Sequence, residues 1–198
     1  MSQNIAVLIL AAGASSRMGT PKQLLPWEKT TLIGNAIRIA TDSNATGVFV
    51  ILGANFKKIS PAIAKEQAVV LKNPNWKDGL GSSIAYGIGH LMEIDKTLDG
   101  VLIMLCDQPL ISPEYLNLLL SKFNGKEKRI VATDYGNRAG VPAIFDNAYF
   151  SELRQLKDDF GAKKILENHK EVLIRVDPKG LELDLDTPEE YKTLREES

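Results

Sequence analysis

The sequence predicts an α/β protein of three layers, in which helices cover both faces of a mostly parallel β-sheet. Short apolar runs of strand length alternate with segments whose apolar residues recur at helical spacing, an order typical of parallel strands joined by crossover helices. The runs are apolar almost throughout, as expected for strands covered on both faces. A length of 198 residues, with 44% hydrophobic and 25% charged residues, is ordinary for one globular domain. We therefore expect residues 1–198 to form a single domain.

Four apolar runs predict the parallel strands, at residues 5–11, 47–52, 68–71 and 100–106. All four are rich in β-branched residues or leucine, which favour strands. Between the first two runs, apolar residues at helical spacing predict the first crossover helix. The residues of this pattern are Leu32, Ile33, Ala36, Ile37 and Ala40.

The second half of the chain has clear helix starts. Ser112 followed by Pro113 is typical of an N-cap and a first helical position. Residues 129–149 contain two strand-like pieces around a glycine-containing turn at 137–142, and we expect them to add antiparallel strands at the far edge of the sheet. Residues 187–190, Thr-Pro-Glu-Glu, form a capping box, which predicts a helix from about Pro188 toward Glu196.

Charge and cysteine content exclude several classes of protein. Lys and Arg total 24 against 25 Asp and Glu, so no basic field attracts nucleic acid or an anionic membrane. The single cysteine, Cys106, cannot form an intrachain disulfide, which fits a reducing compartment. The apolar run at residues 5–12 is too short to span a bilayer and has no basic segment before it. We expect a cytoplasmic protein that binds neither nucleic acid nor membranes.

The most informative segment, residues 10–24, follows the first predicted strand. Ligands of open α/β sheets bind at the carboxyl ends of strands, and small residues at 11–16 let backbone N–H groups approach an anion. Arg17 and Lys22 add positive charge at the rim. The segment is neither G-x-G-x-x-G, because Ser15 replaces the second glycine, nor a P-loop, because Lys does not follow Gly19. We therefore expect a phosphate-binding loop of another kind.

Carboxylates follow two further strand-like segments. Asp107 ends the fourth predicted strand, beside the loop, where it could hold Mg²⁺; this ion takes one or two carboxylates and completes its shell with phosphates and water. Asp184 and Asp186 are two residues apart, so both point to one side of an extended chain. A returning strand would be needed to bring them to Asp107.

The motif A-A-G-x-S-S-R-M-G-x-x-K-Q at residues 11–23 resembles the molybdenum cofactor cytidylyltransferases, which are MobA-like nucleotidyltransferases. The resemblance implies a Rossmann-like sheet of the nucleotide-diphospho-sugar transferase type. It also implies that Arg17, Lys22 and Asp107 are catalytic, with Arg17 and Lys22 on the triphosphate. Related guanylyltransferases usually read L-A-G-G where this chain has Ala12 before Gly13, so the resemblance favours CTP. The loop residues implied to hold the nucleotide are Leu10, Ala11, Ala12 and Gly13.

The same resemblance extends along the chain. Residues 73–83, after the third predicted strand, match elements that contact base and ribose, which implies nucleotide-binding roles for Asn73, Gly79, Ser82 and Ser83. The D-x-D-T-P element at 184–188 implies that Asp186, with Asp184 as second choice, completes a Mg²⁺ site with Asp107, and Mn²⁺ is possible.

Two further elements resemble those that face the pterin substrate in relatives, R-x-G-x-P-x-x-F at 138–145 and G-D-x-G-A-[KR] at 158–163. This chain departs from them at Val141, where a histidine is common, and at Asp158, where a glycine is common. The implied substrate residues are Arg138, Gly140, Gly161 and Lys163.

The resemblance implies transfer of CMP from CTP to the terminal phosphate of molybdopterin, with release of pyrophosphate. A guanylyltransferase that uses GTP and a nucleotidyltransferase for another small phosphate are the alternatives among enzymes. A chaperone that delivers the cofactor is the alternative outside enzymes. Expected partners are CTP, molybdopterin, and a molybdoenzyme or its maturation chaperone.

Overall fold

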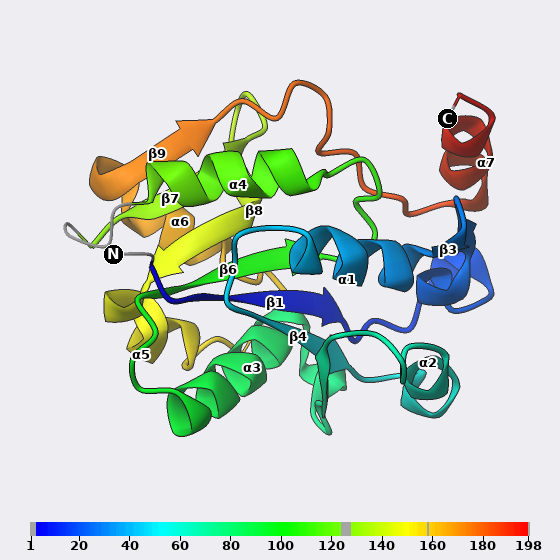
Figure 1. The fold of residues 1–198 in the computed structure, drawn as a ribbon, viewed down its shortest axis with the longest axis horizontal. Helices are drawn as coiled ribbons and strands as arrows, with labels where there is room; N and C mark the ends of the chain where they lie inside the picture. The colour runs from blue at the N-terminus through cyan, green and yellow to red at the C-terminus, as the bar shows by residue number, and fades with distance from the viewer. Residues whose placement is uncertain (1–2, 124–127, 158, 198) are drawn as a thin grey trace.

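A computed structural model describes residues 3–123, 128–157 and 159–197, and in it a seven-stranded sheet lies between two layers of helices (Figure 1). The strand order is β5-β4-β1-β6-β8-β7-β9. The prediction of a mostly parallel α/β sheet is confirmed. The strands are β1 (Ile5–Ala11), β4 (Gly47–Leu52), β5 (Val69–Lys72), β6 (Gly100–Leu105), β7 (Ile130–Asp134), β8 (Ala139–Asp146) and β9 (Leu173–Val176), with a separate hairpin of β2 (Pro26–Trp27) and β3 (Thr30–Thr31).

Each face of the sheet has its own hydrophobic core. Side chains of β1 alternate between the two cores: Val7 and Ile9 enter one, and Leu8 and Leu10 enter the other. Gly87 lets one helix approach the sheet closely, because a Cβ there would lie 2.6 Å from Leu8 Cδ1. On the first face lie α1 (Leu32–Thr41), α2 (Phe56–Ala62) and α4 (Pro113–Lys122), and on the second α3 (Leu80–Ile94), α5 (Phe150–Leu153) and α6 (Lys163–Asn168).

Helix capping follows the sequence expectations. The Ser112 hydroxyl accepts a hydrogen bond from the Tyr115 N–H, with Pro113 in the first turn of α4. Before α7 (Pro188–Glu197), the Thr187 hydroxyl accepts from the Glu190 N–H, and the Glu190 carboxylate accepts from the Thr187 N–H. The capping box is therefore formed in both directions.

The antiparallel strands predicted for residues 129–149 are confirmed, since β8 pairs antiparallel with both β6 and β7, but the predicted turn and the predicted place at the edge of the sheet are wrong. The turn is at 135–138, so residues 139–142 belong to β8, and β8 lies inside the sheet between β6 and β7. Pro142 argues for an edge strand, but the ladder with β7 shifts register at Ala132/Thr133, which accommodates it. The Phe145 side chain is fully buried, as in a central strand.

The edge of the sheet beyond β7 is formed by β9, which no sequence pattern indicated. It pairs parallel to β7 and is only four residues long. The side chains of Leu173 and Ile174 are half-buried, that of Arg175 is exposed and only that of Val176 is buried. A short strand of that kind carries little periodicity.

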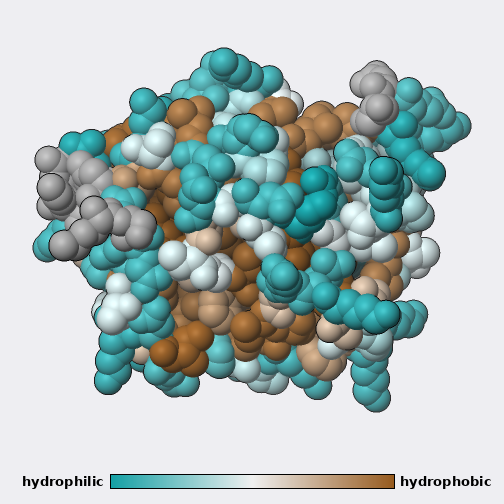
Figure 2. Space-filling model, viewed as in Figure 1, coloured by the Kyte–Doolittle hydropathy of each residue, from teal (hydrophilic) through white to brown (hydrophobic). Residues whose placement is uncertain are grey.

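The parallel strands β1, β4 and β6 end at the same edge, on the right of Figure 1. Ala11 pairs with Leu52, and Leu10 pairs with Leu105, so the three following loops lie together. Figure 2 shows hydrophilic side chains around the rim of this view and hydrophobic ones mainly between them, toward the middle. Among the described residues, no helix is long and apolar enough to cross a membrane.

Candidate functional site

A buried glutamine fixes the loop that follows β1. The Gln23 side chain is 1% exposed, and its Nε2 donates to the carbonyls of Ala11 and Gly13, both at 3.0 Å. Its Oε1 accepts from the Ser15 hydroxyl at 3.2 Å. With these carbonyls turned toward Gln23, backbone N–H groups of the loop are available to an anion. A Cβ on Gly13 would meet nothing within 4 Å, so this part of the loop faces open space.

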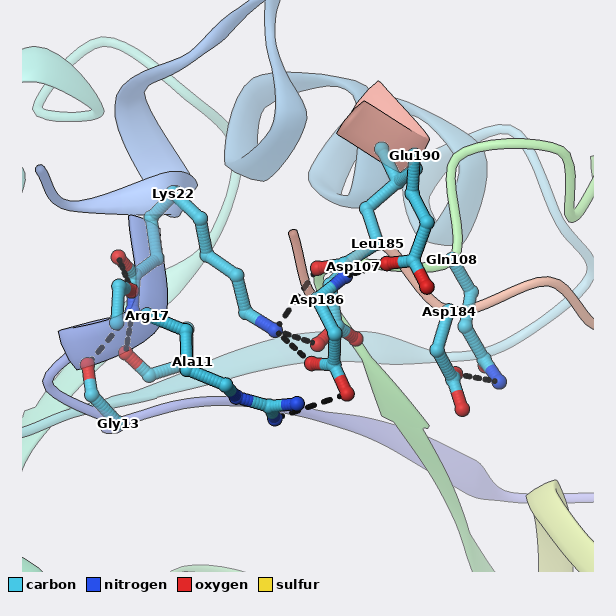
Figure 3. Close-up of polar contacts among 12 residues, drawn as sticks. Ala11, Gly13, Arg17, Lys22, Asp107, Gln108, Asp184, Leu185, Asp186 and Glu190 are labelled. Carbon is cyan, nitrogen blue, oxygen red and sulfur yellow. Dashed lines mark hydrogen bonds and ion pairs between the residues drawn. The ribbon is translucent and has the colours of Figure 1, made fainter. Parts of the chain in front are cut away.

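The Lys22 ammonium lies between two carboxylates from distant parts of the chain (Figure 3). It donates to Asp107 Oδ2, to Asp186 Oδ1 at 3.1 Å and to the Leu185 carbonyl at 3.1 Å. The Lys22 and Asp107 side chains are 16% and 13% exposed, so this pair is shielded from water. The structure thus brings Lys22, Asp107 and Asp186 together, whereas the resemblance implied Lys22 on the triphosphate and only the two carboxylates side by side.

The protonation of this cluster is set by its neighbours. Burial acts to lower the pKa of Lys22, but the charges and hydrogen bonds of Asp107 and Asp186 outweigh burial and raise it above 10.5. Burial acts to raise the pKa of Asp186, yet Lys22 and Arg17 outweigh it and lower that pKa below 3.8. At neutral pH Lys22 is therefore a cation and Asp186 an anion.

Arg17 approaches the cluster from the loop. Its Nη2 lies 2.9 Å from Asp186 Oδ2, but the Arg17 side chain is 68% exposed. An exposed ion pair of this kind contributes little stability. Arg17 can therefore exchange this carboxylate for a phosphate at small cost.

Residues 181–187 bring the second carboxylate to the site. They form an extended segment without strand pairing, so the returning strand expected here is absent from this described part of the chain. Two other contacts replace it: the Leu185 N–H donates to the Asp107 carbonyl at 2.9 Å, and the fully buried Leu185 side chain packs with Trp27 and Leu32.

Asp184 points away from Lys22, to Gln108 (Figure 3). Gln108 is 2% exposed, and its Nε2 donates to Asp184 Oδ1 at 2.8 Å and to the Tyr135 hydroxyl at 2.7 Å. Burial and the nearby Asp107 charge raise the pKa of Asp184. Of the two candidates in the D-x-D element, Asp186 is the one that shares a cation with Asp107.

The donor set suits a small oxygen-binding cation. Asp107 Oδ1 is buried and has no hydrogen-bond partner within the described residues, so this oxygen is free to coordinate a cation. Among the described residues, no three or more His, Cys, Asp or Glu side chains are placed so that they alone could hold a metal ion. Mg²⁺ needs no such group, because two carboxylates and substrate phosphates are enough. Asp107 and Asp186 thus fit a cation that arrives with a nucleoside triphosphate.

A cleft of about 430 Å³ opens beside this cluster and contains most of the predicted nucleotide residues. Trp76, which the sequence analysis did not single out as a site residue, also lines it, with Lys77 Nζ 5.7 Å from its ring centre. The position of Trp76 shortly after Asn73-Pro74, an element already implied to bind the nucleotide, was the signal in the sequence that could have identified it. The predicted residues in the cleft lining are Leu10, Ala11, Ala12, Gly13, Lys22, Gly79, Ser83 and Asp107.

Asn73 and Ser82 lie elsewhere, along a separate groove. The Asn73 side chain is 1% exposed and donates to the hydroxyls of Ser82 and Ser83, both at 3.1 Å. Its Oδ1 accepts from the Asn75 N–H. Asn73 thus ties the turn before α3 to the first residues of that helix.

A second pocket of about 140 Å³ adjoins the cleft and is lined by Arg138, Gly140 and Lys163, together with Asp184. We call it the acceptor pocket. Gly161 lies at its border: a Cβ there would be 2.8 Å from Leu80 Cδ2, and its φ of +55° favours glycine. Asp158 lies outside the described residues.

The site depends on two buried glutamines, Gln23 and Gln108, whose roles the sequence analysis missed. Each directly follows a predicted catalytic residue, which was the available signal. Cys106 is buried beside Asp107, and burial raises the pKa of its thiol, so it is an apolar core residue. His169 Nε2 lies 2.9 Å from Glu152 Oε2, remote from the lining of the cleft.

A model of the MobA-like NTP transferase domain matches residues 7–172. This stretch includes the loop after β1, Asp107 and β8. The chain belongs to the MobA-like NTP transferase family. It is therefore a nucleotidyltransferase, and the MobA-like family and the fold predicted from the sequence are confirmed.

Several known proteins are similar to this chain over most of its length. The purine catabolism protein PucB of Bacillus subtilis is 28% identical over 95% of this chain and 94% of PucB. A probable molybdenum cofactor guanylyltransferase of Bacillus cereus is 31% identical over 72% of this chain and 68% of that protein. The crystal structure of Rv0371c from Mycobacterium tuberculosis has a TM-score of 0.83 at 28% identity, covering 99% and 100% of the two chains. A crystal structure of Rv0371c in complex with manganese has a TM-score of 0.81 at 26% identity, covering 99% of this chain and 100% of that one.

Proposed function

We propose that this nucleotidyltransferase transfers CMP from CTP to the terminal phosphate of molybdopterin and releases pyrophosphate. The observation that carries the proposal is the Lys22 ammonium held between Asp107 and Asp186, at the edge of a cleft that leads from the loop after β1 to the acceptor pocket. A phosphoryl-transfer site needs such a concentration of fixed charge beside an anion-binding loop.

The nucleotide is proposed to occupy the cleft. Backbone N–H groups of residues 10–13, held in place by Gln23, would face the phosphates, and Ser83 and Gly79 lie along the rest of the cleft. Lys22 and Arg17 would bind the pyrophosphate that departs. Both are cations close to a carboxylate that they can share with the substrate.

The acceptor phosphate is proposed to enter from the acceptor pocket. One of its oxygens attacks the α-phosphorus of the nucleotide, a new P–O bond forms, and the bond to the β-phosphate oxygen breaks. A phosphate monoester is largely ionised near neutral pH, so the attack needs no strong general base. Within the described residues no histidine lines the cleft or the acceptor pocket, which is consistent with this step.

Asp107 and Asp186 are proposed to hold a divalent cation that enters with the nucleotide, Mg²⁺ or Mn²⁺. Such an ion supplies charge neutralisation between phosphate oxygens. For it to bind there, the Lys22 ammonium would leave at least one carboxylate and turn to the triphosphate.

GTP is the second candidate for the nucleotide. Ala12 before Gly13 favours CTP by resemblance, whereas relatives such as the one in Bacillus cereus are named guanylyltransferases. Another small phosphate remains the alternative acceptor, and a cofactor chaperone is the alternative without catalysis. A partner molybdoenzyme, or its maturation chaperone, and a cytoplasmic location remain predictions.

The test is pyrophosphate release from CTP or GTP, with and without molybdopterin and with Mg²⁺ or Mn²⁺. We expect release that requires both molybdopterin and a metal, and a competition between CTP and GTP that CTP wins. A preference for GTP would assign the protein to the guanylyl branch. Nucleotide binding without pyrophosphate release would support the chaperone.

The matched variants are Asp107→Ala and Asp99→Ala. Removing Asp107 should reduce turnover by roughly 10²- to 10³-fold or more, as for loss of a group that stabilises transition-state charge. Asp99 lies at the opposite end of β6, so its removal controls for the loss of a carboxylate. Wild-type turnover in Asp107→Ala would refute the site.

A further inference from the structure

The nucleotide cleft has two ends, and the order of the strands determines which residue lies at each. In the sheet, β4 and β5 lie on one side of β1, and β6 lies on the other. The loop after β1 is therefore flanked by Asp107, which follows β6, and by Trp76, which follows β5, and both residues line the cleft. Because the phosphates are proposed to lie beside Asp107, the nucleoside would extend toward Trp76.

A glycine lets Trp76 pack directly against the loop after β1. A Cβ at Gly53 would lie 2.4 Å from Trp76 Cβ and 2.7 Å from the Ala12 carbonyl oxygen, so any larger residue would push the two apart. Gly53 does not have a positive φ, so close packing and not a left-handed backbone requires glycine here. The same Ala12 carbonyl accepts a hydrogen bond from the Ala54 N–H at 3.0 Å. Trp76 is therefore fixed relative to the loop that carries Ala12.

The turn that carries Trp76 is also held from its own side. The buried Asn73 side chain accepts a hydrogen bond from the Asn75 N–H at 2.9 Å and donates one to the Ser83 hydroxyl at 3.1 Å, so it ties this turn to α3. The Trp76 side chain packs against the core on the second face of the sheet but remains partly exposed. Trp76 thus presents a fixed aromatic surface to the cleft.

A fixed aromatic wall at the nucleoside end of the cleft can both bind and select a base. Contact with an aromatic ring stabilises any base, so this contact alone does not discriminate between nucleotides. The position of the ring can discriminate, because Gly53 and Ala12 behind it prevent it from moving back. A base with one ring then fits between the phosphate-binding loop and the wall, whereas a base with two fused rings meets the wall, and a steric clash of this kind creates specificity.

We propose that Trp76 is a specificity-determining residue, whose side chain forms the end wall of the base subsite and limits the base to a single ring, as in a pyrimidine. The selection of a pyrimidine then depends on a residue outside the loop after β1, in addition to Ala12. This inference rests on the proposed function for the orientation of the nucleotide, but it concerns binding, which requires neither an acceptor nor turnover.

The test measures the Kd of CTP, GTP and inorganic tripolyphosphate by calorimetric titration, each with Mg²⁺. Wild-type protein should bind CTP about tenfold or more tightly than GTP. Trp76→Ala should raise the Kd of CTP about fivefold or more, as for loss of a base–aromatic contact, without raising that of GTP. Trp76→Phe, a smaller change, should shift the preference in the same direction by less. Tyr86→Ala, which removes an aromatic side chain of α3 that is 40% exposed and outside the cleft lining, should preserve the wild-type preference. All variants should bind tripolyphosphate, which has no base, like the wild type.

Tripolyphosphate distinguishes a contact with the base from support of the loop. If Trp76→Ala weakens tripolyphosphate binding as much as CTP binding, Trp76 supports the loop and the proposal is wrong. It is also wrong if Trp76→Ala retains the wild-type preference for CTP, or if the wild type binds GTP as tightly as CTP. A preference that Trp76→Ala removes, in a protein without turnover on molybdopterin, would refute the proposed function and leave the wall standing. Turnover of CTP by the wild type, with a preference that Trp76→Ala retains, would refute the wall alone.

Discussion

Lys22 neutralises two carboxylates that would otherwise repel each other across the cleft. Lys22→Met removes the ammonium and retains the length of the side chain. We expect a loss of stability of about 3 kcal/mol at most, because the exposed fractions of Lys22 and Asp107 are small but not zero. Turnover should fall by roughly 10²- to 10³-fold. Mg²⁺ should raise the melting temperature of the variant more than that of the wild type, since the metal no longer competes with an ammonium.

Thermal unfolding with and without Mg²⁺ measures this difference. Lys65→Met, at an exposed position remote from the cleft, is the matched control and should respond like the wild type. An equal response to Mg²⁺ in Lys22→Met would show that Asp107 and Asp186 do not hold the metal in the absence of nucleotide.

Asp184 has a pKa raised by burial and by Asp107, so its charge costs stability in the folded protein. Asp184→Asn removes the charge, while its Oδ1 can still accept from Gln108. We expect the metal-free variant to melt about 2–4 °C higher at neutral pH, the shift that roughly 1 kcal/mol gives in a chain of this size. Because the folded-state pKa exceeds the unfolded one, the cost is complete above the folded pKa and disappears below the unfolded value near 3.8. The gain should therefore shrink as the pH falls.

The melting temperatures of wild type and Asp184→Asn, measured from neutral pH down to about pH 4, test this prediction. Asp177→Asn is the control, because Asp177 is exposed and its Oδ1 accepts a backbone hydrogen bond from Lys179. A gain for Asp184→Asn that does not depend on pH would contradict the assignment to charge.

At this scale the sequence predicts charged groups better than the neutral groups that hold them. Lys22 and Asp107 stand out because their spacing from glycines and strand ends is distinctive. Gln23 and Gln108 act through backbone and side-chain partners that only the folded chain brings near, so their local sequence gives only their position directly after Lys22 and Asp107 and does not show what they bind.

Among the elements, the loop after β1 depends on the side chain of Gln23. Gln23→Leu leaves the carbonyls of Ala11 and Gly13 without this donor, so we expect a loss of about 1–3 kcal/mol in stability. The loop N–H groups would no longer be held toward the phosphates, and the Kd for Mg²⁺-CTP should rise about tenfold. Calorimetric titration measures the Kd, with the exposed Gln155→Leu as control. Unchanged nucleotide affinity in a destabilised Gln23→Leu would mean that the loop does not depend on this glutamine.

The extended segment 181–187 is held to the site by Leu185. Leu185→Ala removes a fully buried side chain, at a cost of about 2–5 kcal/mol in a rigid core and less where the segment can detach. We expect the metal concentration for half-maximal turnover to rise, because Asp186 is no longer fixed beside Asp107, while nucleotide binding to the loop persists. Leu183→Ala, at an exposed position of the same segment, should leave the metal requirement unchanged. Equal metal requirements in both variants would separate the segment from the metal site.

Elements with strong local signals were predicted, and those fixed by tertiary contacts were not. The four apolar runs became β1, β4, β5 and β6, and both proline-containing helix starts were correct. The place of β8 inside the sheet depends on pairing with residues of β6 that lie 40 to 46 positions earlier in the chain, and no local pattern encodes that partner. A returning strand was expected at residues 181–187, to bring Asp184 and Asp186 to Asp107. The segment is instead held by a hydrogen bond from the Leu185 N–H to the Asp107 carbonyl and by burial of the Leu185 side chain, without β-sheet pairing.

For the molecule as a whole, the two cores share one sheet, so we expect a single cooperative unfolding transition. β1 contributes alternate side chains to both cores, and neither face can separate without exposing it. Scanning calorimetry should show one peak, which Mg²⁺-CTP moves upward without splitting. Two peaks, of which the nucleotide moves one, would contradict the prediction of a single domain for residues 1–198.

The chain order of the charged cluster matters while the protein is being made. Lys22 and Asp107 leave the ribosome well before Asp186, which follows all the strands of the sheet. A nascent chain that ends just before that aspartate already contains the loop and every strand of the sheet, so under the proposed function we expect it to bind nucleotide without consuming it. Under the proposed role of Asp186, we therefore expect turnover to become possible only late in translation, when residues 181–187 bind beside Asp107.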